Sequence, residues 1–153
     1  MVPFVLLGAL RNTPVLRIAR SALRVIEAHA QADAPVECCG LLIGAGEHVH
    51  RAVPTRNVRA SQARYLVDPQ QHFDAQRLAR EEGLAVIGAY HSHPASPPVP
   101  SETDLREALE IGFLYLIVTP AGAGRTAEAR AYRFSGDAFE ALDLEVVAGA
   151  RGT

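Results

Sequence analysis

The chain has 153 residues, and 15 basic and 17 acidic side chains give it a formal net charge of −2 at pH 7. This length favours a single domain with a sizeable core, and the small negative charge offers no broad basic field for nucleic acid. No apolar run reaches the length of a membrane span. All 15 basic residues are arginine, a bias compatible with a GC-rich bacterial genome.

The first predicted elements follow from apolar runs and the residues that bound them. Residues 1–14 begin MVPFVLLGAL, with no basic residue ahead of the apolar run and no clear cleavage site. We therefore expect an N-terminal extension or edge strand here rather than a secretion signal. A short strand is predicted at 15–18. A helix should follow from Ser21, as its cap, to about Ala32, with a stripe of Leu23, Ile26 and Ala30 facing the core.

The middle of the chain contains one well-marked helix between strands. Asp68 and Pro69 form a typical helix start, and Gly83 ends the helix after about Glu82. Before this helix, strands are predicted at 39–44, 47–53 and 63–67.

The second half continues the alternation of strands and helices. A central strand is predicted at 84–93, a helix at 101–112, and strands at 113–119 and 129–134, whereas residues 136–147 should finish as a helix and strand or fray in part. This order predicts an α/β fold. We expect a single-domain mixed β-sheet flanked by helices over 15–147, followed by a tail at 148–153.

The two cysteines, Cys38 and Cys39, are neighbours in the sequence. Adjacent cysteines rarely form a disulfide with each other, so we expect a cytoplasmic protein in a reducing compartment. Thiolates are good zinc ligands. These two, however, lie at the entry of an apolar run and would face opposite sides of a strand. We expect them to pack in the interior rather than bind metal.

Residues 89–105, AYHSHPASPPVPSETDL, concentrate side chains that can bind metal. His91 and His93 lie two apart at the end of a predicted strand, so their imidazoles project from the same face. Asp104 follows a loop that prolines restrict, which reduces the entropy lost in fixing the loop. Two imidazoles and a carboxylate suit zinc and leave a fourth position open, as in catalytic sites. Water bound there has its pKa lowered to about 7.

Each part of this pattern also has an ordinary structural interpretation. The run SETD, residues 101–104, is a normal helix start with Ser101 as the cap, and a histidine pair can be a solvated strand end. The combination is harder to explain without a metal. His48 and His50 are also two apart, but no proline loop or later carboxylate pattern follows them. We expect them on the polar face of an exposed strand.

The combined motif resembles that of a known metalloprotease family. Residues 91–104, HSHPASPPVPSETD, are similar to the zinc signature of the JAMM (MPN-plus) family: His-x-His-Pro, then Ser-x-x-Asp at the matching spacing. Glu37, in the run PVECCGLLIG, occupies the place of the family's glutamate before a Cys-Gly-Leu-Leu strand. The likeness covers about 15–134. No signature position is substituted, which separates the chain from metal-free MPN relatives.

The resemblance implies the MPN architecture, similar to that of cytidine deaminases, and a zinc metallopeptidase with a role for each matched residue. His91, His93 and Asp104 would bind one zinc ion per chain. Glu37 would accept a proton from the zinc-bound water and pass it to the leaving amine. Ser101 would donate a hydrogen bond to the developing oxyanion.

The substrate class also follows from the resemblance. Members of the family cut peptide or isopeptide bonds after the C-terminal Gly-Gly of ubiquitin-like proteins, and short bacterial members process small sulfur-carrier proteins, as in one route of cysteine synthesis. The compact length and lysine-free composition favour the bacterial branch. A narrow groove beside the strands would suit a Gly-Gly tail, because glycine lets the backbone pass closely.

Other functions remain open at this point. A non-catalytic module could use the same fold to hold a ubiquitin-like partner, although the complete ligand set argues against it. A related His-x-His-Pro domain occurs with DNA-repair proteins, but the acidic balance and the missing helix-hairpin-helix segment weigh against nucleic acid. A deaminase site is disfavoured, because no Pro-Cys-x-x-Cys follows a His-x-Glu. The native metal, zinc or iron, and the oligomeric state stay undetermined.

Overall fold

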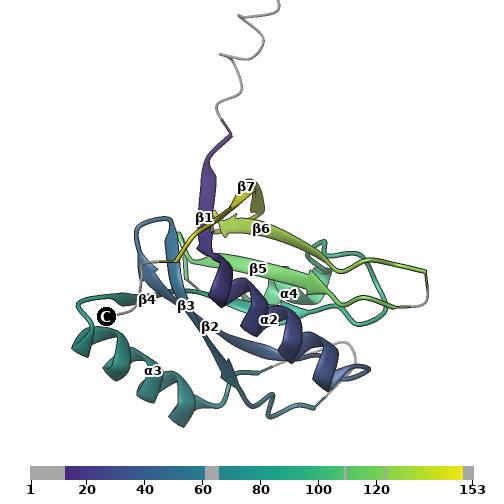
Figure 1. The fold of residues 1–153 in the computed structure, drawn as a ribbon, viewed down its shortest axis with the longest axis horizontal. Helices are drawn as coiled ribbons and strands as arrows, with labels where there is room; N and C mark the ends of the chain where they lie inside the picture. Colours follow the sequence, from purple (N-terminus) through teal and green to yellow (C-terminus); the bar gives the residue numbers. More distant parts are fainter. Residues whose placement is uncertain (1–12, 61–65, 109, 123, 150–153) are drawn as a thin grey trace, which may run out of the picture.

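Figure 1 shows a computed structural model of the chain, which describes residues 13–60, 66–108, 110–122 and 124–149. Within these residues the strands form one mixed sheet that closes on itself in the order β1-β3-β2-β4-β5-β6-β7. The predicted α/β fold is confirmed, and closure of the sheet is an added feature. The elements are β1 (Val15–Ala19), α2 (Arg20–Asp33), β2 (Cys39–Ala45), β3 (His48–Thr55), α3 (Pro69–Glu81), β4 (Ala85–Ser92), α4 (Glu102–Glu107), β5 (Leu114–Thr119), β6 (Glu128–Phe134) and β7 (Phe139–Val147).

Helix α2 packs across the inner face of the curved sheet (Figure 1). Its buried side chains are Ala22, Ile26 and Ala30, and the predicted Leu23 packs partly against the same core. Burial of each such aliphatic side chain stabilises the folded state by roughly 1.5–3 kcal/mol. The cluster between α2 and the sheet is the main hydrophobic core. The strands supply its other members, among them Leu16, Leu42, Val49, Tyr90, Leu116, Ala131 and Leu142.

The outer face of the sheet carries two smaller clusters. On one side, Ala75 of α3 packs over Leu41 and Ala89 of the central strands. On the other, Tyr115, Ile117, Tyr132 and Phe134 form a cluster on β5 and β6. Because side chains alternate along a strand, His91 points to the same outer face as Ala89. The end of β4 therefore presents its histidine between the two clusters.

Two predicted helix boundaries are wrong for local reasons. Ser21 does not cap α2: Ala19 holds that position without a side-chain cap bond, because β1 runs directly into the helix. Helix α4 ends at Glu107 instead of 112. Its last residue is followed by Ala108 in an extended conformation (φ −70°, ψ 128°). By contrast, Asp68 caps α3 as predicted, accepting a hydrogen bond from the Gln70 amide at 2.9 Å.

The C-terminal prediction is wrong in part. Residues 136–147 contain no helix; instead, β7 pairs antiparallel with β6 and parallel with β1, which closes the sheet. Of the strand expected at 63–67, only residues 66 and 67 are described, and Val67 forms an isolated bridge with Asn57. Expectations for residues 1–12 and 150–153 also lie outside them.

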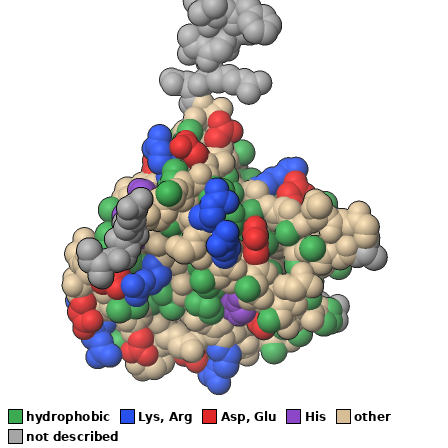
Figure 2. All heavy atoms as spheres, in the orientation of Figure 1, with side chains coloured by type: hydrophobic (Ala, Val, Ile, Leu, Met, Phe, Trp, Pro, Cys, Tyr) green, Lys and Arg blue, Asp and Glu red, His purple; other side chains and the backbone are tan. Residues whose placement is uncertain are grey.

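Charged side chains of both signs are interspersed over the face in Figure 2. Several are joined in exposed pairs, such as Arg51 with Glu82 at 2.8 Å and Arg130 with Glu128 at 2.9 Å. Exposed pairs of this kind stabilise the fold little. Among the described residues, no helix is both long enough and apolar enough to cross a membrane.

Candidate metal centre

The centre is built around the end of β4. His91 lies in the ladder, with Cys39 of antiparallel β2 on one side and Ile117 of parallel β5 on the other. Its side chain is 1% exposed. His93 follows the strand, and its backbone amide donates to the Val118 carbonyl at 2.8 Å. The two imidazoles therefore sit on one face, with ring centroids 5.1 Å apart, as the alternation predicts.

Three side chains hold the proline loop after His93, because each contacts a backbone carbonyl of the loop. Nδ1 of His93 contacts the Pro97 carbonyl oxygen at 2.9 Å, which leaves Nε2 facing the centre. The Thr119 hydroxyl donates to the Ser96 carbonyl at 2.6 Å, and the Tyr132 hydroxyl donates to the Pro98 carbonyl at 2.8 Å. The loop thus fixes both the orientation of His93 and the position at which α4 begins.

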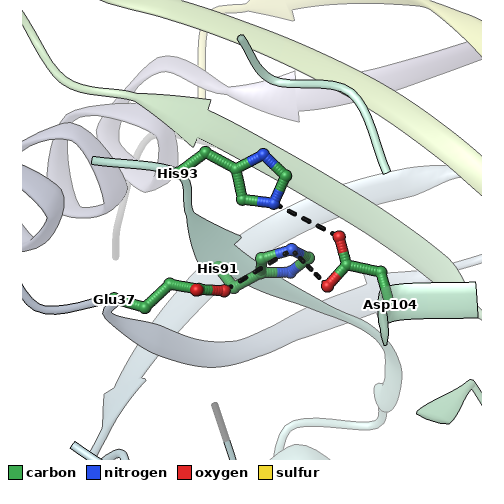
Figure 3. Close-up of side chains that lie close together, drawn as sticks. All are labelled: Glu37, His91, His93 and Asp104. Carbon is green, nitrogen blue, oxygen red and sulfur yellow. Dashed lines mark hydrogen bonds and ion pairs between the residues drawn. The ribbon is translucent and has the colours of Figure 1, made fainter. Parts of the chain in front are cut away.

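Asp104 is brought to the histidines by the cap of α4. Ser101 accepts a hydrogen bond from the Asp104 amide at 3.0 Å, and the Ser101 amide donates to Asp104 Oδ2 at 2.8 Å. The two carboxylate oxygens then reach different imidazoles (Figure 3): Oδ1 lies 3.3 Å from His91 Nε2, and Oδ2 lies 3.2 Å from His93 Nε2. The ordinary cap and the ligand position are therefore compatible in one residue.

Glu37 approaches His91 from the side opposite Asp104 (Figure 3). The residue is 2% exposed, and its carboxylate lies 4.0 Å from His91 Nε2. The next residue fixes its backbone, because the Cys38 amide donates to the Ser92 hydroxyl at 2.8 Å and the Ser92 amide donates to the Cys38 carbonyl at 3.1 Å. Ligand atoms of Glu37, His91, His93 and Asp104 all lie within 4.8 Å of one another.

Burial and mutual contacts set the charges of this group. Burial raises the pKa of Glu37 to about 7, although His93 opposes this effect. Burial also lowers the pKa of His91. For Asp104, burial acts to raise the pKa, but the hydrogen bonds from both imidazoles outweigh it and lower the pKa. For His93, burial acts to lower the pKa, and the bonds to Asp104 and Pro97 outweigh it and raise the pKa.

A divalent metal fits this donor set. Metal binding requires a deprotonated carboxylate and neutral imidazoles, and the pKa shifts favour an ionised Asp104 and a neutral His91. The carboxylates of Glu37 and Asp104 share one buried volume, where a cation would offset their repulsion. Two imidazole nitrogens and a carboxylate are donors that zinc accepts. The structure thus brings four predicted residues together, with Ser101 at the neighbouring helix cap.

A groove lies on the same outer face as His91, between α3 and α4. Leu41 and Ala89 form its floor, and they alternate along β2 and β4 with Cys39 and His91. Glu107, one turn after Asp104, lies at its wall. The remaining lining residues are Leu66, Val67, His72, Phe113 and Tyr115. Another groove, lined by Gly46, Glu47, Val86 and Arg133 among others, lies at the opposite end of β4 from the histidines.

The sequence analysis missed the residues that tie this region together. Asn57 donates from Nδ2 to the Glu37 carbonyl at 2.9 Å, and Arg59 pairs with Glu107 at 2.6 Å. These contacts join positions 20 and 48 residues apart, respectively. No periodicity or motif spacing marks such pairs, so only the folded structure identifies them.

The other candidate ligands lie elsewhere. Cys38 packs in the inner core, whereas Cys39 faces Thr55 with 3.5 Å between Sγ and Oγ1, so both pack as predicted. Burial raises the pKa of both thiols, to about 12 and about 11, respectively, which disfavours the thiolate. His48 and His50 stack on each other, with ring centroids 4.3 Å apart and both residues half-buried.

The fold and the buried group define a JAMM-type metallopeptidase, and the chain is therefore a hydrolase. A family model described as prokaryotic homologs of the JAB domain matches residues 19–135, and the chain belongs to this family. A solved structure described as "JAMM: A Metalloprotease-like Zinc Site in the Proteasome and Signalosome" has a TM-score of 0.55 and 25% identity, with 87% of this chain and 98% of that chain covered.

Two curated relatives are similar over most of their length. A desampylase from Haloferax volcanii is 36% identical over 138 residues, which cover 86% of this chain and 96% of the relative. A CysO-cysteine peptidase from Mycobacterium tuberculosis is 30% identical over 135 residues, which cover 87% and 92%, respectively. Both relatives are enzymes, so the alternative of a non-catalytic module loses its support.

Proposed function

We propose that this chain is a zinc peptidase that hydrolyses the peptide or isopeptide bond after the C-terminal Gly-Gly of a small ubiquitin-like or sulfur-carrier protein. The observation that carries the proposal is the buried group of Glu37, His91, His93 and Asp104, whose ligand atoms lie within 4.8 Å of one another. The names of the two relatives, a desampylase and a CysO-cysteine peptidase, support the substrate class.

His91, His93 and Asp104 are the proposed zinc ligands. Each has a nitrogen or oxygen atom directed at the same point, and each is positioned by a different restraint: the β4 ladder, the Pro97 carbonyl and the α4 cap. When bound, zinc supplies Lewis-acid chemistry, which lowers the pKa of a water molecule to about 7 and polarises the scissile carbonyl.

Glu37 is the proposed proton carrier. Its carboxylate lies 4.0 Å from His91 Nε2 and beside the proposed ligands, so it can accept a proton from the attacking water and release it again to the leaving amine. Ser101 is proposed to donate its hydroxyl hydrogen to the oxyanion. That hydroxyl oxygen accepts from the Asp104 amide, so its hydrogen is available for a second partner.

The groove between α3 and α4 is the proposed seat of the carrier tail. Its floor residues, Leu41 and Ala89, lie on the strands that carry the centre, so a chain extended along them would bring its end toward His91. Glycine at the last two positions would let the backbone approach the buried ligands without a side-chain clash.

The test uses carrier proteins of the ubiquitin fold that end in Gly-Gly, each extended by one further residue. Zinc-loaded enzyme should release that residue, intact mass spectrometry should detect the shortened carrier, and a chelator should stop the reaction. Glu37→Gln should lower turnover at least about 100-fold while zinc content stays the same, because glutamine keeps the shape but cannot accept a proton from water.

The matched control replaces the final Gly-Gly of the carrier by Ala-Ala. Cleavage of the control at the same rate would refute the proposed tail specificity. Full turnover by Glu37→Gln, or full turnover after complete zinc removal, would refute the mechanism.

A further inference from the structure

Asn57 connects the glutamate of the centre to a segment of the chain far from it in sequence. Its Nδ2 donates to the Glu37 backbone carbonyl at 2.9 Å. Its Oδ1 accepts from two backbone amides, those of Arg59 at 3.0 Å and Leu66 at 2.9 Å. Asn57 also forms an isolated bridge with Val67. One half-buried carboxamide therefore joins the backbone of Glu37 to the backbone at Arg59 and Leu66.

Glu37 precedes β2, so the strand ladder does not fix its backbone and other contacts must do so. On its C-terminal side, the Cys38 amide and carbonyl are both bonded to Ser92, the residue between the two histidines. Asn57 holds the carbonyl of Glu37 itself. The direction of the Glu37 side chain depends on this backbone, so the carboxamide helps to keep the carboxylate 4.0 Å from His91.

The other end of the connection reaches the groove and α4. Leu66 and Val67 line the groove, and both contact Asn57. Arg59, whose amide Asn57 also holds, pairs with Glu107 on the helix that carries Asp104. The contacts therefore run from the backbone of Glu37, through Asn57, to the groove wall and to the helix on the far side of the centre.

We infer that Asn57 is a positioning residue for hydrolysis, which holds the backbone of Glu37 at a fixed place relative to the groove wall at Leu66 and Val67. The inference rests on the proposed function and adds a residue to it. A base displaced by about 1 Å can slow an enzymatic step about 100-fold. A single carboxamide that sets the base against the bound tail is therefore expected to affect turnover more than stability.

A purely structural role is the competing explanation, because the bond from Oδ1 to the Arg59 amide is an ordinary Asx turn. Two substitutions separate the explanations. Asn57→Asp keeps the acceptor oxygen for Arg59 and Leu66 but has no hydrogen to donate to Glu37. Asn57→Ala removes both functions. Gln70→Ala is the control, since it removes an exposed carboxamide that bonds to Asp74 within α3.

Zinc-loaded variants are compared by kcat and KM on the Gly-Gly carrier fusion, by zinc content and by melting temperature. For Asn57→Asp we expect kcat to fall about 10- to 100-fold with less than about a threefold change in KM and unchanged zinc content. Asn57→Ala should also raise KM, because the groove wall loosens. Gln70→Ala should match the wild type.

The pH profile distinguishes displacement from the added charge of aspartate. Displacement lowers the plateau of kcat, whereas a charge effect only moves the limb of the profile along the pH axis. An unchanged plateau for Asn57→Asp, or a fall in melting temperature without any fall in kcat, would overturn the inference.

Amide hydrogen exchange provides a readout that needs no substrate. We expect the Cys38 amide to exchange faster in Asn57→Asp and Asn57→Ala, and the Arg59 and Leu66 amides to exchange faster in Asn57→Ala alone. Wild-type protection of Cys38 in both variants would refute the inference even if no carrier is cleaved. Failure of the wild type to cleave any carrier would count only against the proposed function.

Discussion

Ser101 caps α4, and the proposed oxyanion role would give the same residue a second function with a different energetic signature. As the cap of α4 it accepts from the Asp104 amide at 3.0 Å, and its own amide donates to the Asp104 carboxylate at 2.8 Å. Loss of a cap hydroxyl typically costs about 1 kcal/mol of stability. Loss of a hydrogen-bond donor to an oxyanion costs about 100- to 1,000-fold in turnover. A single substitution therefore reports both roles on separate scales.

Ser101→Ala should lower turnover on the carrier fusion about 100-fold and the free energy of unfolding by only about 1 kcal/mol, because the hydroxyl caps α4 and is proposed to donate to the oxyanion. Zinc content should stay the same, since the Ser101 amide still donates to Asp104. Ser101→Thr, which retains the hydroxyl, is the control and should recover most of both losses. Turnover of Ser101→Ala within about threefold of wild type would rule out the oxyanion role.

The residues of the centre could be predicted from sequence to different extents. The spacing of His91 and His93 is local, so the alternation of a strand was sufficient to place them together. Asp104 required the proline loop to turn back, and Glu37 required the family resemblance, because an acidic residue before a strand is usually solvated. Asn57 had no local signal, since its role depends on a carbonyl 20 residues away.

At the scale of elements, the packing of the Tyr90 ring of β4 over β2 depends on a glycine. An added Cβ at Gly40 would lie 2.3 Å from the ring of Tyr90, which is fully buried. The Tyr90 hydroxyl contacts His29 Nδ1 of α2 at 2.8 Å, and His29 Nε2 contacts Asp33 at 3.2 Å. The Tyr90 ring thus lies against Gly40 of β2, and its hydroxyl is held by His29 of α2, so the ring has little room to move.

Gly40→Ala should lower the free energy of unfolding by about 1–3 kcal/mol, because the added methyl group overpacks the contact with Tyr90. Tyr90→Leu removes the ring and also costs stability, by about 2–5 kcal/mol. In the double variant the losses should be less than additive, since the clash is absent. Chemical denaturation of the four proteins measures this coupling. Strict additivity would show that Gly40 is required for a reason other than the ring.

The elements that sequence predicted correctly are those with strong local signals. The Asp68-Pro69 start of α3 is one, and the apolar runs of β2, β4 and β5 are others. The C-terminal segment was wrong in part because pairing in the folded state overrides local preference. Helix α4 was wrong only in its end, where Ala108 adopts an extended conformation. Residues 139–147 gain partners on two strands, β6 and β1, and a helix there would leave both edges of the sheet unpaired.

At the scale of the whole molecule, the centre buries ionisable groups away from the water that would solvate their charges at the surface. Glu37, His91, His93 and Asp104 are each at most 9% exposed. Two carboxylates so close together repel each other, and ionised groups lose solvation when buried. The rest of the fold stabilises this arrangement through the closed sheet and the α2 core, and a bound cation would relieve the repulsion. Metal binding should therefore be coupled to stability.

Zinc should raise the melting temperature of the metal-free protein because it binds the folded state and not the unfolded chain. At a free zinc concentration 1,000 times the dissociation constant, this linkage gives about 4 kcal/mol. For a chain of this size the corresponding rise in melting temperature is on the order of 10 °C. Calorimetry in zinc-buffered solutions would measure it. Asp104→Asn should lose most of the rise, because the carboxylate that contacts both imidazoles is gone.

The control for that measurement is the stacked pair His48 and His50, which offers a surface alternative for zinc. The double variant His48→Gln/His50→Gln should keep the full rise in melting temperature. If it instead lost the rise while Asp104→Asn kept it, zinc would be bound at the surface pair. The buried group could then not be the metal centre. Because the two variants leave different donor sets intact, their comparison tests the location of the metal independently of any assay for cleavage.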